Sequence, residues 1–321
     1  MDTLISLILP IYNEGKNIEE LYQRSRAVLE KTGDYEIIFV NDGSSDDSLE
    51  KIVALSRLNS RVKLVDFSRN FGHQIAITAG LDFALGDAVV IMDSDLQDTP
   101  ETIAEMVAAW REGYDVVYAK RRTRQDGFFK KATAFIFYRI LKKLANIDIP
   151  EDTGDFRLIS REVADHLMAM GESNKFLRGQ IAWLGFSQVS VDFERQERKA
   201  GETKYTLRRM MRFAMDGITS FSNFPLQIAT FLGFLFSLFA FFIILYALYS
   251  KFILKEVVTG WTSLMISTMF IGGIQLLCIG IIGEYISRIS SDVKRRPPYV
   301  IEETNCLAEN AGTGKGEVPG S

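Results

Sequence analysis

Two aspartates stand two positions apart at the end of a short apolar run. The run covers residues 88–92, and Asp93 and Asp95 follow it. Carboxylates at this spacing on an extended segment point to the same side, and such oxygen ligands suit a hard divalent cation, Mg²⁺ or Mn²⁺. Gln97 can add an amide oxygen, and a bound cation would neutralise the charge on a departing diphosphate. The alternative interpretation is a surface turn, in which aspartate is common.

Two further polar segments follow apolar runs in the same way. Residues 10–14 follow the first run of the chain and residues 41–47 follow the second. Ligands of a parallel sheet collect beyond the carboxyl ends of its strands, so we expect these segments and the aspartate pair to converge on one edge. A residue at 44–46 can cap the next helix. Asp42 has no capping role, and it either forms part of the turn or accepts a hydrogen bond from the imide N–H of uracil or guanine.

These side chains need a scaffold in which strands and helices alternate. Apolar runs typical of strands alternate with periodic apolar positions typical of helices over the first 120 or so residues. The predicted strands are 4–9, 35–40, 62–67, 88–92 and 116–119, and the predicted helices lie near 17–31 and 48–58. This order predicts an α/β domain with a largely parallel sheet.

Composition and charge exclude several classes of protein. The 321 residues allow one large domain with additional segments, and the formal net charge of −4 argues against a nucleic-acid-binding protein. Cys278 and Cys306 lie in unlike surroundings, so the sequence predicts neither a disulfide framework nor a Cys/His zinc site. The N-terminus lacks the basic segment and the continuous apolar core of a signal peptide. We therefore expect the N-terminal domain to stay in the cytoplasm.

Two long uncharged stretches late in the chain predict a transmembrane hairpin. They cover residues 226–250 and 257–283, and each exceeds the roughly 20 residues that a helix needs to span a bilayer. Basic residues flank the hairpin on both sides: Lys204, Arg208, Arg209 and Arg212 before it, and Arg288, Lys294, Arg295 and Arg296 after it. The positive-inside rule then places both ends in the cytoplasm, although Lys251 and Lys255 in the short connection weaken the bias slightly.

Taken together, the motifs resemble the ordered motif set of family 2 glycosyltransferases. The residues that carry the resemblance are 9–14, 40–46, 68–74, 92–98 and 153–157. With the late hairpin, the chain is similar more narrowly to the polyprenyl-phosphate glycosyltransferases, which include dolichol-phosphate mannose synthase and the bactoprenol glucosyltransferases. The sequence Asp-Ser-Asp-Leu-Gln-Asp and the two-span C-terminal part look closer to the bactoprenol branch. The resemblance covers roughly residues 4–296.

The resemblance implies a fold, a donor and a cofactor. The fold is α/β, a GT-A (Rossmann-like) nucleotide-sugar-binding domain followed by a two-helix transmembrane hairpin. The donor is a nucleoside-diphosphate sugar, and Mg²⁺ or Mn²⁺ binds Asp93 and Asp95, with Gln97 as a candidate third ligand. Carried over in the same way, the residues that bind the nucleotide are Pro10, Tyr12, Glu14 and Asp42.

Three further residues receive candidate roles near the reacting groups. Asp155 matches the family's position for a catalytic carboxylate near the acceptor. The alternatives are a loop aspartate paired with Arg157, or Asp152 as the catalytic carboxylate. Arg198 and Lys204 can reach over the diphosphate as a mobile lid, as a similar segment of the family implies, or they belong to a plain basic linker before the membrane.

A lipid phosphate acceptor explains why a catalytic domain would carry membrane segments. Residues 128–144 and 206–224 have apolar positions at helical spacing among Lys and Arg, and such helices can lie among lipid headgroups. Alternatively, their apolar stripes pack on the domain or on another subunit. Candidate ligands of the acceptor phosphate are Arg121, Arg122 and Arg139, which otherwise belong to a solvated charge run.

The expected organisation has four parts. They are a cytoplasmic GT-A catalytic domain over 1–205, an amphipathic juxtamembrane helix over 206–225, a transmembrane hairpin within 226–290 and a polar, disordered tail over 297–321. The expected location is the inner (plasma) membrane, with several spans and both termini in the cytoplasm. Gly272, Gly273, Gly280 and Gly283 allow close helix packing, in keeping with the homo-oligomers of the family.

The expected function is that of an inverting glycosyltransferase. It would move a hexose, glucose from UDP-glucose, to a polyprenyl phosphate such as undecaprenyl phosphate. One alternative is an enzyme similar to dolichol-phosphate mannose synthase that uses GDP-mannose, and another is a noncatalytic membrane scaffold or lipid carrier. A processive polysaccharide synthase would need more spans and a Gln/Arg-x-x-Arg-Trp segment, which the sequence lacks.

Overall fold

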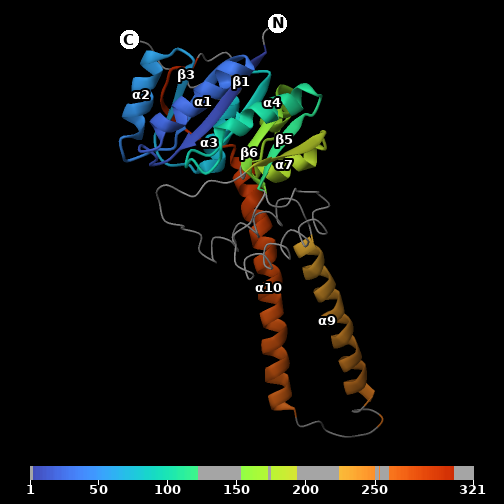
Figure 1. Ribbon diagram of the computed structural model, residues 1–321. Helices are drawn as coiled ribbons and strands as arrows, with labels where there is room; N and C mark the ends of the chain where they lie inside the picture. The colour runs from blue at the N-terminus through green and yellow to red at the C-terminus, as the bar shows by residue number, and fades with distance from the viewer. Residues whose placement is uncertain are drawn as a thin grey trace. The chain divides into compact units, whose positions relative to one another are not determined.

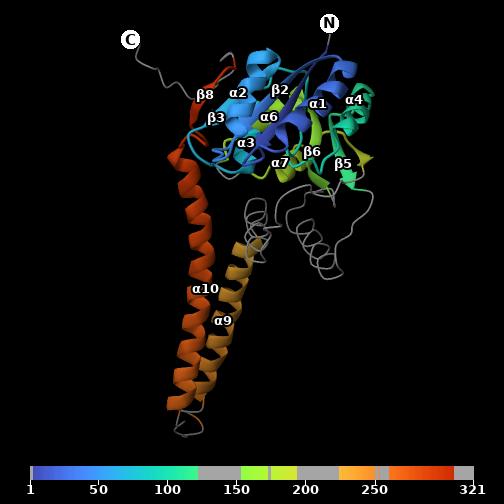
Figure 2. The ribbon, with the colours of Figure 1, turned by 60° about the vertical axis from the view of Figure 1, so that its left-hand side comes forward.

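The structure, a computed structural model, describes residues 3–121, 153–172, 175–193, 224–249, 253 and 260–306. Predictions for residues 122–152, 194–223 and 307–321 therefore fall outside the described residues. The described chain forms two compact units, drawn in Figures 1 and 2. One is an α/β unit, which the chain enters a second time at residue 296, and the other is a pair of long helices within residues 224–295.

An eight-stranded mixed sheet forms the centre of the α/β unit. Its strands are β1 (Leu4–Ile11), β2 (Asp34–Asn41), β3 (Val62–Phe67), β4 (Ala88–Ile91), β5 (Val116–Arg121), β6 (Thr153–Ser160), β7 (Gln188–Phe193) and β8 (Ile301–Thr304). Across the sheet they follow the order β7-β5-β6-β4-β1-β2-β3-β8. Strands β4, β1, β2 and β3 are parallel, whereas β6 runs antiparallel to both β4 and β5.

Helices cover both faces of this sheet (Figure 1). One face carries α1 (Ile18–Thr32), α2 (Ser48–Leu58), η1 (Pro100–Thr102) and α4 (Ile103–Arg111); the other carries α3 (His73–Phe83), α6 (Arg161–Ala169) and α7 (Leu177–Leu184). Successive side chains of a strand point to opposite faces, so Leu7 and Leu9 lie in the first core and Ile8 in the second. Because both faces are covered, the central strands are continuous apolar runs.

The predicted strands and helices of the first 120 or so residues are confirmed, with ends shifted by two residues or fewer. The expectation of a largely parallel sheet is only partly right, because β6 and β8 are antiparallel to their neighbours. Strand β6 has alternating apolar residues, with Phe156 and Leu158 in one core and Ile159 in the other. The polar residues between them hid this strand from the sequence.

The segment after the second long helix is ordered, which corrects the predicted disordered tail for residues 297–306. Strand β8 pairs antiparallel with the edge strand β3 (Figure 2). The ring of Tyr299 stacks on Phe67 with centroids 5.1 Å apart, and its hydroxyl donates a 2.6 Å hydrogen bond to Asp82. Main-chain pairing and one aromatic anchor stabilise this segment, so its polar composition was misleading.

The second unit consists of two long apolar helices, α9 (Phe224–Tyr249) and α10 (Trp261–Lys294). At 1.5 Å per residue their lengths are about 39 and 51 Å, and each has a stretch long and apolar enough to cross a membrane. Phe236 packs edge-on against Phe270, and the Cys278 thiol contacts the carbonyl of Ala229. These pairs show that the helices pack antiparallel, as a hairpin.

Helix α10 extends beyond the predicted span. The uncharged stretch ends at residue 283, but the helix continues to Lys294, and Glu284, Arg288 and Lys294 in this last part are good helix formers. Large apolar side chains on both helices are exposed, among them Phe231 at 64% and Leu276 at 72%, as expected of surfaces that face lipid. Among the described residues, a Cβ added at Gly272 or Gly280 would meet no atom within 4 Å. The glycines therefore do not form the contact between α9 and α10, and the predicted oligomer stays a prediction.

Candidate active site

The three polar segments meet at the carboxyl ends of β4, β1 and β2, as the sequence predicted. The backbone N–H of Asn13 donates to the Ser44 hydroxyl at 3.0 Å, which joins the segments after β1 and β2. The Ser94 hydroxyl donates to the Pro10 carbonyl at 2.8 Å, which joins the segments after β4 and β1. Because these strands are neighbours in the sheet, their ends form one continuous polar edge.

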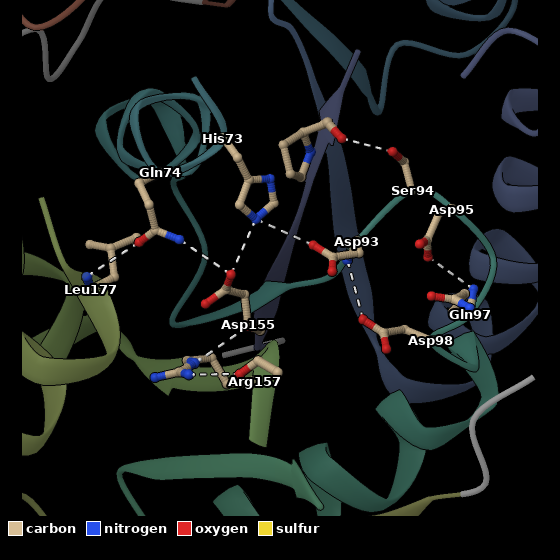
Figure 3. A network of polar contacts seen from close by, with 12 residues as sticks. His73, Gln74, Asp93, Ser94, Asp95, Gln97, Asp98, Asp155, Arg157 and Leu177 are labelled. Carbon is tan, nitrogen blue, oxygen red and sulfur yellow. Dashed lines mark hydrogen bonds and ion pairs between the residues drawn. The ribbon is translucent and has the colours of Figure 1, made fainter. Parts of the chain in front are cut away.

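Asp93 has one carboxylate oxygen without a hydrogen-bond partner. Its Oδ1 is buried and accepts no hydrogen bond from the described residues, although His73 Nε2 lies 3.4 Å away, while the side chain as a whole is 36% exposed (Figure 3). Partial burial raises the pKa of Asp93, and the charges of Asp155 and Asp95 add to this effect against that of His73. A buried carboxylate oxygen that accepts no hydrogen bond, and whose contact with His73 is an ion pair at 3.4 Å, fits a bound cation.

Asp95 and Gln97 form a turn directly after Asp93. The Asp95 carboxylate accepts the backbone N–H of Gln97 at 3.1 Å, so the turn interpretation of the sequence is present in the structure. Among the residues that the structure describes, no three His, Cys, Asp or Glu side chains are grouped so that they could hold a metal ion. A cation at Asp93 and Asp95 would therefore need oxygens from water and substrate, which Mg²⁺ usually retains. The three predicted metal ligands stay predictions.

Asp42 has a role that the sequence did not reveal. It is 3% exposed, and its carboxylate accepts the backbone N–H groups of Phe71 at 2.6 Å and of Gly72 at 3.0 Å. Burial raises the pKa of Asp42, and these two hydrogen bonds oppose that shift. At Gly43, where φ is +64°, a Cβ would come within 2.6 Å of the backbone of Arg69. Asp42 thus connects the loop before α3 to the end of β2 by hydrogen bonds. Its predicted contact with the nucleotide stays a prediction.

Tyr12 and Glu14 lie at the same polar edge. The Tyr12 side chain is 52% exposed, and Glu14 accepts a 2.6 Å hydrogen bond from the side chain of Asn17. An exposed aromatic ring beside acidic strand ends is suited to stacking on a nucleotide base. Pro10, Tyr12 and Glu14 lie at the end of β1, and their predicted contact with the nucleotide stays a prediction.

Asp155 lies on β6, next to β4, at the centre of a polar network (Figure 3). Its Oδ1 accepts Arg178 Nε at 2.7 Å, and its Oδ2 lies 3.2 Å from both Gln74 Nε2 and His73 Nε2. Burial alone would raise the pKa of Asp155, but the cationic Arg178 and the hydrogen bond from His73 outweigh it and hold the pKa well below its ordinary value. Asp155 is therefore ionised.

His73 joins the two acidic strand ends. Partial burial lowers the pKa of His73, but the hydrogen bond to Asp155 and the charges of Asp93 and Asp155 outweigh it and raise the pKa to about 9. The imidazole then carries a positive charge near neutral pH, between two carboxylates 3.2 and 3.4 Å away. His73 and Gln74 belong to a motif noted in the sequence, but no role was predicted for them. Arg178 gave no sequence signal at all.

The alternative of a loop aspartate paired with Arg157 is wrong. Both residues lie on β6, and the Arg157 guanidinium donates to the backbone carbonyls of Gly154 at 2.9 Å and of Asp155 at 3.3 Å. Arg157 is 6% exposed, and this burial lowers its pKa to about 10. It supports the backbone beneath Asp155, while the Asp155 carboxylate itself is bound by other residues.

Several predicted site residues cannot be placed. Arg122, Arg139, Asp152, Arg198 and Lys204 lie outside the described residues. Arg121 ends β5, and its side chain is not described. The predicted lid and the predicted acceptor-phosphate site therefore stay predictions.

Comparison with known proteins places this site in a family. The family model described as glycosyl transferase family 2 matches residues 6–168. Relatives include an uncharacterized glycosyltransferase, YkcC, of Bacillus subtilis, which is 50% identical over 93% of both chains. They also include a prophage bactoprenol glucosyl transferase homolog of Escherichia coli, 41% identical over 93% of this chain and 98% of its own. The bactoprenol glucosyl transferase of Shigella phage SfII is 40% identical over 94% and 98%.

Among solved structures, the fold is similar to glucosyl-3-phosphoglycerate synthase from Mycobacterium tuberculosis. That match has a TM-score of 0.48 and 19% identity, and it covers 68% of this chain and 76% of the other. The mixed sheet with helices on both faces agrees with the predicted α/β domain, and two apolar helices follow it, as predicted. The family model spans half of the chain, and relatives at 40–50% identity cover nearly all of it. The chain belongs to glycosyltransferase family 2.

Proposed function

We propose that this protein is a membrane-anchored inverting glycosyltransferase that transfers a hexose, glucose from UDP-glucose, to a polyprenyl phosphate. The observation that carries the proposal is the pairing of Asp93 and Asp155 at adjacent strand ends. Asp93 has a carboxylate oxygen that accepts no hydrogen bond from the described residues, Asp155 is held ionised, and His73 forms ion pairs with both. The names of the relatives support the acceptor, because bactoprenol glucosyl transferases match this chain through both apolar helices.

The donor side of the site lies at the ends of β1, β2 and β4. Tyr12 offers an exposed ring for the base, and Asp42 with Gly43 fixes the loop that closes this side. Asp93 and Asp95 would hold Mg²⁺ or Mn²⁺. When bound, the cation supplies positive charge that stabilises the diphosphate leaving group.

The acceptor reaction needs little proton transfer. One oxygen of a lipid phosphate is already anionic near neutral pH, and it attacks the anomeric carbon from the face opposite the leaving nucleotide. A new bond forms between the anomeric carbon and the acceptor oxygen. The bond between the anomeric carbon and the diphosphate oxygen breaks at the same time, so the anomeric configuration inverts. An Asp155 whose pKa is held low is a poor base. We therefore assign it an orienting and electrostatic role.

The membrane part explains how the two substrates meet. A polyprenyl phosphate keeps its chain in the hydrocarbon and presents its head at the bilayer surface, so the catalytic unit must be held at that surface. Helices α9 and α10 would span the membrane as a hairpin with both ends in the cytoplasm. We place the protein in the plasma membrane on these grounds.

Transfer of labelled sugar tests the proposal. The purified full-length protein in detergent receives undecaprenyl phosphate and a panel of UDP- and GDP-sugars, with Mg²⁺, Mn²⁺ or EDTA. We expect one glycosyl phospholipid from UDP-glucose that requires the metal and is lost in Asp95→Ala. Transfer from GDP-mannose instead would favour the chemistry of dolichol-phosphate mannose synthase, and no transfer from any donor would favour the noncatalytic scaffold.

A further inference from the structure

Helix α7 contacts the network around Asp155 through the Arg178 side chain and through the backbone N–H of Leu177. We propose that Arg178 is a positioning residue, which holds the Asp155 carboxylate in the orientation that sugar transfer requires. This inference rests on the proposed function, since it assigns a purpose to Asp155 in that reaction. Its physical basis is the way in which α7 fixes both oxygens of one carboxylate.

The first contact is direct and charge-assisted. Arg178 Nε donates to Asp155 Oδ1 at 2.7 Å, which is short for a hydrogen bond between nitrogen and oxygen. The Arg178 side chain is 23% exposed and that of Asp155 is 10% exposed, so solvent screens the pair only in part. The guanidinium is planar and fixes the direction of approach as well as the distance.

The second contact runs through Gln74. The Gln74 Oε1 accepts the backbone N–H of Leu177 at 3.3 Å, and a backbone N–H can only donate. This contact fixes which end of the amide faces α7, so Gln74 Nε2 is the group that donates to Asp155 Oδ2 at 3.2 Å. Consecutive residues of α7 thus restrain different oxygens of Asp155, and together they prevent rotation of the carboxylate.

Helix α7 is itself well anchored. Leu177 is 4% exposed and Ile181 is 1% exposed, and both lie in the core that α7 shares with α3 and α6. A helix held by packing gives the Arg178 side chain a fixed origin, as a precise reacting site needs. The restraint on Asp155 is therefore transmitted from the core to the site.

The matched control is Arg24, which forms a similar ion pair with Glu101, outside the network around Asp155. Its guanidinium binds Glu101 at 3.0 and 2.8 Å, and its side chain is 21% exposed, close to the value for Arg178. The pair links α1 to η1 and takes no part in the site. Loss of either arginine removes a partly exposed ion pair, but only one of the two pairs includes Asp155.

Steady-state kinetics of the full-length protein tests the proposal. The variants are Arg178→Lys, Arg178→Gln, Asp155→Asn, the double variant Arg178→Gln/Asp155→Asn, and Arg24→Gln. We expect both Arg178 variants to lower kcat on the order of 10- to 100-fold, because a small misplacement of a reacting group is costly. The KM for the donor should stay within about threefold, since binding of the nucleotide is unaffected. Arg24→Gln should retain the kcat of the wild type.

The double variant distinguishes positioning from independent action. If Arg178 acts through Asp155, the double variant turns over as slowly as Asp155→Asn alone, whereas independent effects would multiply. Multiplied losses, or an unchanged kcat in Arg178→Gln while Asp155→Asn is impaired, would overturn the inference. Thermal unfolding of each variant detects loss of the fold, and Arg178→Lys, which keeps the charge, carries the test if Arg178→Gln does not fold. A wild type that transfers no sugar would instead refute the proposed function, and an undiminished Asp155→Asn would refute the role of Asp155.

Discussion

Asp155 and Asp93 are neighbouring carboxylates whose surroundings shift their pKa values in opposite directions. Arg178 and His73 hold the pKa of Asp155 low, whereas partial burial and like charges raise the pKa of Asp93. Groups with such divergent pKa shifts are typical of reaction sites. Asp93 and Asp155 were predicted from short motifs, because each motif is local. Residues His73 and Arg178 were not, because their contacts with Asp155 span 82 and 23 positions and no local pattern encodes them.

The unfavourable electrostatic surroundings of Asp93 lead to a prediction about stability. Asp93→Asn keeps the shape of the side chain but removes the charge of a carboxylate whose pKa is raised in the folded state, because burial, Asp155 and Asp95 outweigh the opposing charge of His73. In metal-free buffer at neutral pH, we expect its melting temperature to equal or exceed that of the wild type, with sugar transfer lost. Differential scanning calorimetry and the transfer assay measure the two effects.

The control for this prediction is an exposed carboxylate. Asp165 pairs with Arg161 at 3.6 Å, and its side chain is 58% exposed. Asp165→Asn should change neither activity nor melting temperature noticeably, since exposed ion pairs contribute about 0–1 kcal/mol. An Asp93→Asn protein with a melting temperature well below that of the wild type would contradict the prediction. It would show that this carboxylate stabilises the folded state.

Elements were predictable where their apolar pattern was complete. Strands β1 to β4 are buried on both faces and carry continuous apolar runs, so the sequence located them. Strand β6 alternates apolar residues with the polar residues of the site, and β8 is a short edge strand with exposed side chains. Both depend on main-chain pairing with neighbours that are distant in sequence. Because β6 and β8 pair antiparallel with these neighbours, the sheet is mixed, and the sequence did not reveal this.

The ordered segment after α10 leads to a second prediction about stability. Tyr299→Phe keeps the stacking on Phe67 but removes the hydrogen bond to Asp82, whose pKa burial raises. This hydrogen bond is partly buried, and a typical intramolecular hydrogen bond contributes about 0.5–1.5 kcal/mol to stability. For a unit of this size its loss lowers the melting temperature by about 2–4 °C for each kcal/mol. The measurement is thermal unfolding of the purified protein.

Tyr114→Phe is the matched control for Tyr299→Phe. Tyr114 is 38% exposed, so loss of its hydroxyl should leave the melting temperature unchanged. Equal melting temperatures for the two variants would contradict the anchoring role of Tyr299. Such a result would assign the order of residues 297–306 to the pairing of β8 with β3 alone.

At the scale of the whole molecule, the chain combines an α/β unit with an apolar helical hairpin. The hairpin was predictable because two uncharged stretches of this length have few other uses, while the end of α10 was not, because helices continue beyond the bilayer. The α/β unit both precedes and follows the hairpin in the sequence. This order requires an even number of spans if the unit is to stay on one side of the membrane.

Cysteine labelling tests this topology. In a background of Cys278→Ser and Cys306→Ser, we expect Lys255→Cys, in the connection between the two spans, to react with a membrane-impermeant maleimide in intact cells. Leu58→Cys, at a site that is 85% exposed in the α/β unit, should react only after the cells are made permeable. Labelling of both sites in intact cells would contradict a cytoplasmic catalytic unit.

The central claim is sugar transfer to a lipid phosphate with inversion. The most direct test is to isolate the lipid product formed from UDP-glucose and undecaprenyl phosphate, and to determine its mass and its anomeric configuration by mass spectrometry and NMR. The account predicts one hexose on each lipid phosphate, an anomeric configuration opposite to that of the donor, and one UDP released for each product. A retained configuration, a sugar chain on the lipid, or UDP released without a glycolipid would contradict it.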